Sequence, residues 1–218
     1  FPYNKCGVGG ALPTQMDFLY NALMTVNDKY NVIVLGHDTI ISSYKETVGG
    51  KQYYDTGETV YNSRAWKCVS DMLSAMKMKT STTVKYSDWS KPYERFDSFP
   101  SKVYDFTNSP NVNVCMTIGG DVHWDILGKT TTDDSKTIKT LHSGDYINIS
   151  TDIPHIVTMT DGSDRGYCDY TTRETICKPA TKGTIDEQAF DIVTINNDGI
   201  FFTRIGSGND RSLLFTSG

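Results

Sequence analysis

Apolar residues recur at helical spacing in two segments of the chain. The first helix is predicted to open near Pro13-Thr14-Gln15 and to end near Asn27-Asp28, because proline fits the first turn, where its missing N–H costs nothing. The second helix is predicted over 63–77, and we interpret its methionines as core filling. The apolar stripes of the two helices are Met16, Leu19, Tyr20, Leu23 and Met24, and Ala65, Trp66, Val69, Met72, Leu73 and Met76.

Short runs of β-branched residues predict strands. The runs 31–35 and 112–118 are apolar and end at glycine, which is typical of buried strands, and 82–86 is a further candidate. Beyond His123 the chain consists of short β-rich segments at 137–141, 146–149, 155–159, 189–195 and 199–205. Asn197-Asp198-Gly199 predicts a hairpin between the last two. A polar loop with a turn at Gly49-Gly50 is expected over 42–58, and irregular structure over 89–110.

This order of elements predicts an α/β (α+β) fold with mixed β-sheets and flanking helices. We expect a single domain over 1–218. Within it, 1–128 forms an α/β part that carries the His37 loop and the Asp121/His123 loop, and 129–218 forms a β-rich part.

Composition narrows the class of protein. The 218 residues are 38% hydrophobic and 11% aromatic, which indicates a packed core. The net charge is −5 and no basic stripe interleaves with aromatics, so no nucleic-acid-binding patch is expected. No apolar stretch reaches the roughly twenty residues of a membrane span, and no signal peptide is visible. Because the chain begins with Phe1, we expect a fragment, a processed product or a trimmed protein.

The five cysteines are too few and too scattered for a disulfide framework. Cys115 lies within an apolar run and is expected to be a buried, unreactive side chain. Cys168 and Cys177 flank a polar, hairpin-like stretch; they can pair in an oxidising compartment, but we expect free thiols.

Three side chains form the candidate metal shell. His37 follows the strand at 31–35, and Asp121 and His123 follow the strand at 112–118. Ligands collect at the carboxyl ends of strands in open α/β sheets, so the three are expected to converge on one side of the sheet. Imidazole suits Zn, Mn or Fe, and carboxylate suits harder cations. The alternative is that each histidine bonds a backbone carbonyl beside a tight turn.

Other candidates have simpler interpretations. His142 and His155 are expected to be surface or hydrogen-bonded histidines, and no Ser-His-Asp spacing supports a hydrolase of that type. Arg204 and Arg211 can meet a phosphate, but surface ion pairing is the default interpretation. Trp124 can stack on a substrate base, although core packing is the default.

The order of elements and two histidine motifs resemble the second half of a calcineurin-like metallophosphoesterase, in the branch common in phages and prophages. His37 matches the lone metal-binding histidine that follows a helix–strand unit in that family. The stretch 120–125, Gly-Asp-Val-His-Trp-Asp, matches the later Gly-His-x-His motif, often followed by x-Asp. The segments 183–193 and 203–211 resemble the closing hairpin, whereas 39–110 and 129–180 match only loosely. The resemblance implies the carboxyl-terminal part of an αββα sandwich.

Two departures from that family bear on activity. Its motifs Asp-x-His, Gly-Asp-x-x-Asp and Gly-Asn-His-Asp/Glu do not occur upstream of His37, so the resemblance implies that they lie in a preceding segment. Asp121 replaces the first histidine of Gly-His-x-His, which favours Mn, Mg or Ca over Zn. By resemblance, His37 and Asp121 would belong to one metal and His123 to the other.

These features predict a metal-dependent phosphoesterase-like domain that hydrolyses phosphate mono- or diesters when its N-terminal half completes it. Its cofactor would be a divalent metal (Mn, Mg, Ca, Fe or Zn), bound weakly or not at all by this chain alone. The expected partner is the upstream half, or another polypeptide that covers an open sheet edge or face. The alternative is a catalytically degenerate phage virion protein, associated with the tail, in a homo-oligomer or virion assembly. A β-rich recognition module is a third class, and the expected location is the virion or the host cytoplasm.

Overall fold

A computed structural model of the chain describes residues 13–37, 45–48, 51–54, 58–59, 64–85, 99–120, 125–135, 137–158, 167–169, 174–176 and 183–216. The helices are α1 (Pro13–Met24), α2 (Arg64–Met78) and the short 3-10 helix η3 (Ile185–Glu187). The strands are β1 (Val32–Leu35), β2 (Lys45–Val48), β3 (Lys51–Tyr54), β4 (Glu58–Thr59), β5 (Ser81–Val84), β6 (Lys102–Asp105), β7 (Cys115–Gly119), β8 (Ile126–Thr131), β9 (Ile138–Leu141), β10 (Tyr146–Ile147), β11 (Asp152–Val157), β12 (Tyr167–Asp169), β13 (Glu174–Ile176), β14 (Ala189–Ile195), β15 (Gly199–Gly206) and β16 (Arg211–Phe215).

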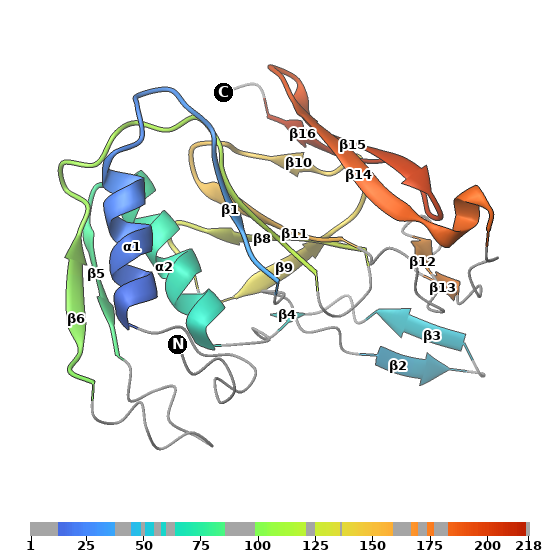
Figure 1. Ribbon diagram of the computed structural model, residues 1–218, viewed down its shortest axis with the longest axis horizontal. Helices are drawn as coiled ribbons and strands as arrows, with labels where there is room; N and C mark the ends of the chain where they lie inside the picture. The colour runs from blue at the N-terminus through green and yellow to red at the C-terminus, as the bar shows by residue number, and fades with distance from the viewer. Residues whose placement is uncertain are drawn as a thin grey trace.

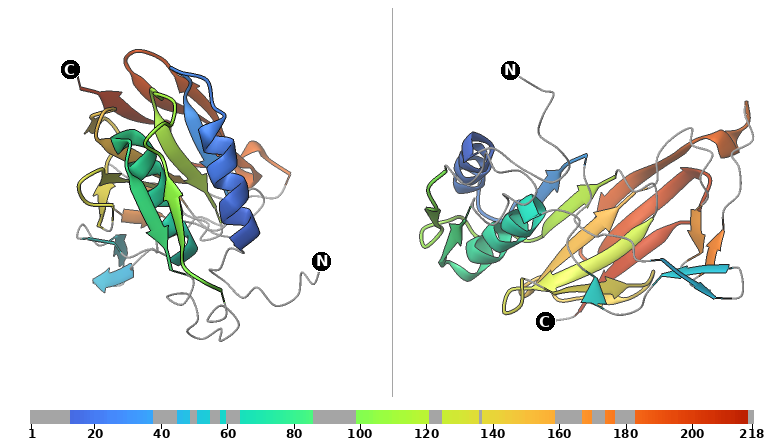
Figure 2. Two further views of the ribbon diagram at one scale, coloured as in Figure 1. Left: turned by 90° about the vertical axis from the view of Figure 1, so that its left-hand side faces the viewer. Right: turned by 90° about the horizontal axis from the view of Figure 1, so that it is seen from below.

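The elements form three layers, with a six-stranded sheet in the middle. Helices α1 and α2 cover one face of this sheet, with the paired strands β5 and β6 lying beyond the helices, and strands β10 and β14–β16 cover the other face (Figure 1). A second orientation shows the same order of layers (Figure 2). Each interface has its own apolar cluster, with Met72 and Cys115 in the helical one and Leu127 and Phe202 in the one between the sheets.

The six-stranded sheet has the order β1-β7-β11-β8-β9-β4. β7 pairs in parallel with β1 and with β11, and β11 pairs antiparallel with β8, so the sheet is mixed. β11 is buried along its whole length, as expected of a strand covered on both faces. The division expected at 128/129 falls inside β8, and this sheet takes strands from both parts.

The second sheet has the order β10-β16-β15-β14. β14 and β15 pair from Ala189↔Gly206 to Ile195↔Ile200, and the predicted hairpin connects them. Asn196 Oδ1 accepts hydrogen bonds from the N–H groups of Asp198 and Gly199, at 2.8 and 3.1 Å, which explains the turn signal.

The ends of both helices follow from local chemistry. Pro13 occupies the first position of α1, as predicted, and the helix ends at Met24, before the expected Asn27-Asp28. Lys79 ends α2 with a left-handed φ of 53°. Its N–H donates to Met76 O at 3.4 Å and the N–H of Thr80 donates to Ala75 O at 3.0 Å, which is a Schellman motif.

The fold class expected from the sequence is confirmed at the level of mixed sheets with flanking helices. The predictions of β1, α2, β5, β14 and β15 are confirmed to within two residues at each end, and β12–β13 is the expected hairpin-like stretch. The prediction of a loop over 42–58 is wrong, because β2 and β3 pair across the predicted Gly49-Gly50 position and β4 joins β9.

Further differences have tertiary causes. The stretch 89–110, expected to be irregular, contains β6, which pairs with β5 and packs on α1 through Tyr104 and Tyr20. β8 and β16 were not predicted, and β11 begins at Asp152 rather than His155. Neighbouring strands, rather than local pattern, define these segments. None of the described helices is long and apolar enough to cross a bilayer.

Candidate functional site

The carboxyl ends of three parallel strands meet at one end of the six-stranded sheet. Gly36 N–H, just after β1, donates to Ile118 O of β7 at 3.0 Å. Thr158 N–H, just after β11, donates to Gly119 O at 2.9 Å. This end is therefore where the loops after β1, β7 and β11 begin, and the first two are the loops in which the sequence predicts candidate ligands.

His37 lies at this end of the sheet, next to the residue that precedes Asp121. Gly120 N–H donates to His37 O at 3.0 Å, and the His37 side chain is exposed. Asp121 and His123 lie outside the described residues, so their convergence with His37 stays a prediction. Trp124 lies outside them as well. Within the described part of the chain, no three His, Cys, Asp or Glu side chains are grouped as a metal site.

The chain resumes at Asp125, whose side chain is buried in a cluster of ion pairs that we call the Asp125–Arg204 network. Arg204 Nη2 lies 2.6 Å from Asp125 Oδ1, and Arg204 Nε lies 2.8 Å from Asp191 Oδ1. Arg211 Nη1 lies 3.0 Å from Asp125 Oδ1, and Arg211 also pairs with Asp191. All four side chains are at most 3% exposed, so the charges compensate one another in a desolvated environment.

The network connects the C-terminal sheet to the end of the large sheet that bears His37. Arg211 Nη1 donates to Val157 O, the last residue of β11, at 3.3 Å. Asp125 directly precedes β8, and Asp191, Arg204 and Arg211 come from β14, β15 and β16. The network therefore fixes the point at which the chain enters β8, two residues after His123.

Two glycines shape the turn beside Arg204, and one of them, Gly208, leaves room for its guanidinium. Gly206 and Gly208 have φ of 96° and 108°, which L side chains rarely adopt. A Cβ on Gly208 would lie 2.5 Å from Arg204 Nη1, and a Cβ on Gly206 would lie 1.8 Å from Gln188 O. Ser207 O, between them, accepts from Arg204 Nη1 at 2.7 Å. The Gly-Ser-Gly turn is thus a cradle for an arginine rather than a phosphate loop.

The surroundings of Arg204 favour the charged form of its guanidinium. Burial disfavours the charged guanidinium, but hydrogen bonds to Asp191 and the charge of Asp125 outweigh that effect and raise the pKa of Arg204. Ion pairing of Arg204 and Arg211 is therefore confirmed. The expectation that these pairs lie on the surface is wrong, because the two sheets pack over both arginines.

A second buried polar group crosses the centre of the large sheet. His155 is fully buried; its Nδ1 lies 2.9 Å from Thr117 Oγ1 and its Nε2 lies 3.0 Å from Thr130 Oγ1. Thr130 Oγ1 in turn lies 3.1 Å from Ser70 Oγ of α2. The expectation of a hydrogen-bonded histidine is confirmed. Burial lowers the pKa of His155 to about 3, so the ring is neutral and has a structural role.

Burial also accounts for Cys115. Its side chain is fully buried, and desolvation raises the pKa of the thiol to about 12 against the opposing charge of Lys77. The prediction of a buried, unreactive cysteine agrees with this environment. Cys168 lies on β12 opposite Thr175, and Cys177 lies outside the described residues.

The role of Asp125, which lies in the 120–125 stretch, was not predicted from the sequence. The signal was present as Arg-Ile-Gly-Ser-Gly-Asn-Asp-Arg over 204–211, in which two arginines flank a glycine turn. Asp191 lies opposite Arg204 in the register of the β14–β15 hairpin, whereas Asp125 is 79 residues away in the sequence and is identified as a partner only by the packing of the two sheets. No protein-family model matches the sequence, and neither a curated protein nor a solved structure matches the chain.

Proposed function

We propose that this chain is the carboxyl-terminal part of a calcineurin-like metallophosphoesterase domain, which hydrolyses phosphate mono- or diesters when an N-terminal half completes it. One observation carries the proposal. The hydrogen bond from Gly120 N–H to His37 O joins the two loops that hold the candidate ligands. Side chains that follow neighbouring parallel strands, about 4.8 Å apart, can share a metal ion.

The layers of the fold support the same proposal. Helices, a mixed sheet and a second sheet are the first three layers of an αββα sandwich (Figure 1). On the outer surface of the second sheet, Phe190 and Ile192 of β14 are exposed. A fourth, helical layer supplied by the completing half would cover them.

The free edge of the large sheet supports completion by further strands. Among the described residues, β1 pairs only with β7, although its sequence Val-Ile-Val-Leu is typical of a strand buried on both sides. Ile33 is 40% and Leu35 72% exposed. An additional strand along this edge would satisfy the outward backbone groups and bury both side chains.

His37, Asp121 and His123 would hold the divalent metals in this proposal. Bound metals generate a hydroxide and stabilise charge on the attacking and leaving oxygens of the phosphate ester. Asp121 supplies a hard ligand, which favours Mn, Mg or Ca. The Asp125–Arg204 network would act as a positioning group, since it holds the chain two residues beyond His123.

Activity assays test the proposal. The chain alone is expected to hydrolyse bis(p-nitrophenyl) phosphate with Mn no faster than buffer, because three ligands do not complete two metal positions. Co-expression with the segment encoded directly upstream should produce Mn-dependent hydrolysis that His37→Ala and His123→Ala abolish. His142→Ala, which alters a histidine outside the candidate shell, is the matched control. Metal-dependent turnover by the isolated chain, lost in His123→Ala, would show instead that the site is complete here.

The second candidate is a catalytically degenerate virion protein of the tail-associated kind. The replacement of the family's histidine by Asp121 favours it, as does the exposed pair Phe190 and Ile192, which suits packing in an assembly. Under this alternative the completed protein neither binds Mn nor hydrolyses esters. Isothermal titration with Zn separates the two: on the enzyme proposal, Asp121→His should tighten Zn binding because imidazole suits Zn better than carboxylate does, and on the structural one it should have no effect.

A further inference from the structure

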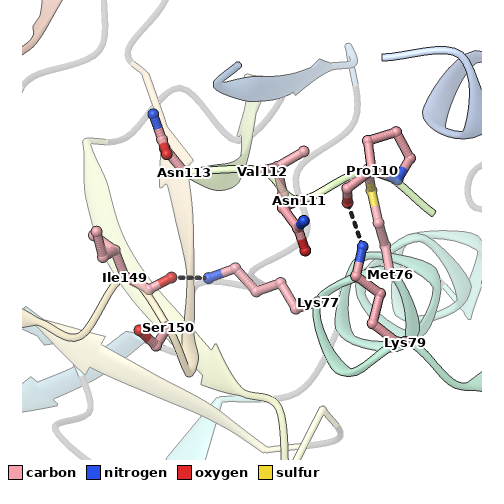
Figure 3. A pocket seen from close by; sticks show the side chains of 9 residues that line it. All are labelled: Met76, Lys77, Lys79, Pro110, Asn111, Val112, Asn113, Ile149 and Ser150. Carbon is pink, nitrogen blue, oxygen red and sulfur yellow. Dashed lines mark hydrogen bonds between the residues drawn. The ribbon is translucent and has the colours of Figure 1, made fainter. Parts of the chain in front are cut away.

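A cavity of about 340 Å³ lies at the end of the large sheet opposite to His37. It is bounded by the last turn of α2, by 110–113 ahead of β7, and by Ile149-Ser150 ahead of β11 (Figure 3). β7 is five residues long and strands rise about 3.3 Å per residue, so roughly 17 Å separates this cavity from the candidate metal loops. The cavity is therefore separate from the candidate metal site.

Two lysine ammonium groups lie in the cavity wall, and their partners there are neutral oxygens. Lys77 Nζ donates to Ile149 O and to Asp152 O, each at 2.6 Å. Lys79 Nζ donates to Ser109 O and, at 2.7 Å, to Pro110 O. Within the described ranges, neither lysine forms an ion pair with a carboxylate, although five other basic side chains do. The cavity wall thus carries two positive charges that no ion pair compensates.

Two carboxylates of residues that adjoin the cavity lining pair with other groups. Asp152 Oδ2 pairs with Lys129 Nζ at 2.6 Å and accepts from Asn148 N–H at 2.8 Å. Asp28 Oδ1 accepts from Asn111 N–H at 2.8 Å, on the chain that borders the cavity. Both carboxylates lower the positive electrostatic potential around the cavity, but neither forms an ion pair with Lys77 or Lys79 among the described residues.

The C-terminus of α2 also contributes a negative pole beside the lysines. Its carbonyls are largely satisfied, because Ser109 Oγ and Lys79 N–H donate to Met76 O, and Thr80 N–H donates to Ala75 O. The two ammonium groups therefore do not donate hydrogen bonds to the carbonyls of Ala75 and Met76. They reach instead toward the loops on either side of the cavity.

We propose that this cavity, the Lys77–Lys79 pocket, binds a small organic oxyanion, with both ammonium groups pairing with its oxygens. Met76 and Val112 provide apolar wall for the carbon part of such a ligand, and the exposed residues Asn111 and Ser150 stand at the rim. The volume is at the lower end of the range for ligand pockets, so the ligand is a small carboxylate or phosphate ester.

One observation on each lysine is consistent with anion binding in the Lys77–Lys79 pocket. Burial lowers the pKa of Lys77, and the charge of Asp152 opposes this only in part. A bound anion would offset the cost of burying the Lys77 ammonium group, because an opposite charge nearby favours its charged form. Lys79 adopts a left-handed φ of 53° where glycine is the usual residue, and its Nζ donates to Pro110 O in the 109–110 segment.

Titration of the full chain by NMR tests the pocket. Inorganic phosphate and acetate are added separately, with EDTA present to remove metal, and sodium chloride at equal ionic strength is the reference. We expect saturable shifts of the amide signals of Asn111, Asn113 and Ser150 with phosphate, acetate or both, and the tighter probe identifies the ligand class. Lys77→Met should weaken binding at least tenfold, whereas Lys77→Arg, which retains the charge, should stay within threefold of the parent.

The control is Lys139→Met, which removes an exposed lysine on β9 and should leave the affinity unchanged. If Lys77→Met does not fold, Lys79→Met provides the same comparison. Linear shifts that chloride reproduces, or equal weakening by Lys139→Met, would show that the lysines only fasten the loops and would overturn the proposal. Shifts confined to His37 and Gly120 would place anion binding at the candidate metal site instead and would also overturn it.

Discussion

The neutral state of His155 predicts a specific loss of stability in acid. The ring lies between Thr117 Oγ1 and Thr130 Oγ1, and a neutral imidazole has one donor and one acceptor for these two hydroxyls. Protonation would place a charge in the centre of the sheet, and in the described part of the chain no carboxylate pairs with this ring. Burial accordingly holds the pKa of His155 at about 3 in the folded state, against an ordinary value of 6.5.

The sign and size of the effect follow from linkage. Between pH 6.5 and 3 the unfolded chain binds a proton at this residue and the folded chain does not, so stability falls as pH falls. The slope approaches about 1.4 kcal/mol per pH unit. Integrated from pH 6 to pH 4, this one residue removes about 2.5 kcal/mol from the free energy of unfolding.

His155→Gln isolates this contribution. Glutamine retains a donor and an acceptor and does not titrate, so the variant loses about 1–2 kcal/mol at pH 7 through poorer hydrogen-bond geometry. The other three histidines are common to both proteins and cancel in the difference. We therefore expect the stability gap, the stability of the parent minus that of the variant, to fall by about 2.5 kcal/mol between pH 6 and pH 4, so that the variant becomes the more stable of the two at pH 4.

Urea unfolding at fixed ionic strength, followed by circular dichroism at several pH values, measures that gap. A gap that stays constant with pH would refute the assignment of a neutral, buried imidazole. If His155→Gln does not fold, NMR of the parent labelled at histidine Cε1 answers the same question. One of its four ring signals should then remain unchanged down to pH 4.

Three further predictions concern the network, its glycine cradle and the buried thiol. Arg204→Met should lower the free energy of unfolding, measured with urea, by about 3–5 kcal/mol because it leaves buried carboxylates uncompensated. Lys102→Met, in an exposed ion pair, should lower it by less than about 1 kcal/mol. Equal losses in the two variants would contradict the role of burial. Gly208→Ala should be more destabilising than Gly144→Ala, since both have positive φ but only the first Cβ meets a neighbour; Tm values compare them. Cys115 should resist a thiol reagent in the folded protein and react after unfolding, and rapid native labelling seen by mass spectrometry would refute its burial.

The sequence by itself determined the elements whose signals are local. Proline at the start of α1, the apolar stripe of α2 and the Asn-Asp-Gly turn between β14 and β15 each depend on neighbours within a few residues, and the structure agrees with all three. The positions of β1 and β7 were predicted for the same reason, because apolar runs bounded by glycine signal buried strands.

Tertiary structure decided the strands that lack a local signal. β2 and β3 consist largely of polar residues and are strands because they pair with each other and with β13. β6 is held by β5 and by the aromatic contact of Tyr104 with Tyr20 of α1. Such pairing energy comes from partners that the sequence pattern does not name.

Some features of the candidate site were likewise predicted from the sequence, and others depended on the tertiary structure. The placement of His37 and of the loop that starts at Gly120 at strand ends was read from the sequence, and so was the chemistry of its ligands. That β1 and β7 are parallel neighbours, which brings His37 O within 3.0 Å of Gly120 N, required the assembled sheet. The burial of Arg204 was decided only when two sheets packed together, because that packing removes the guanidinium from water and brings Asp125 from the other sheet to compensate its charge.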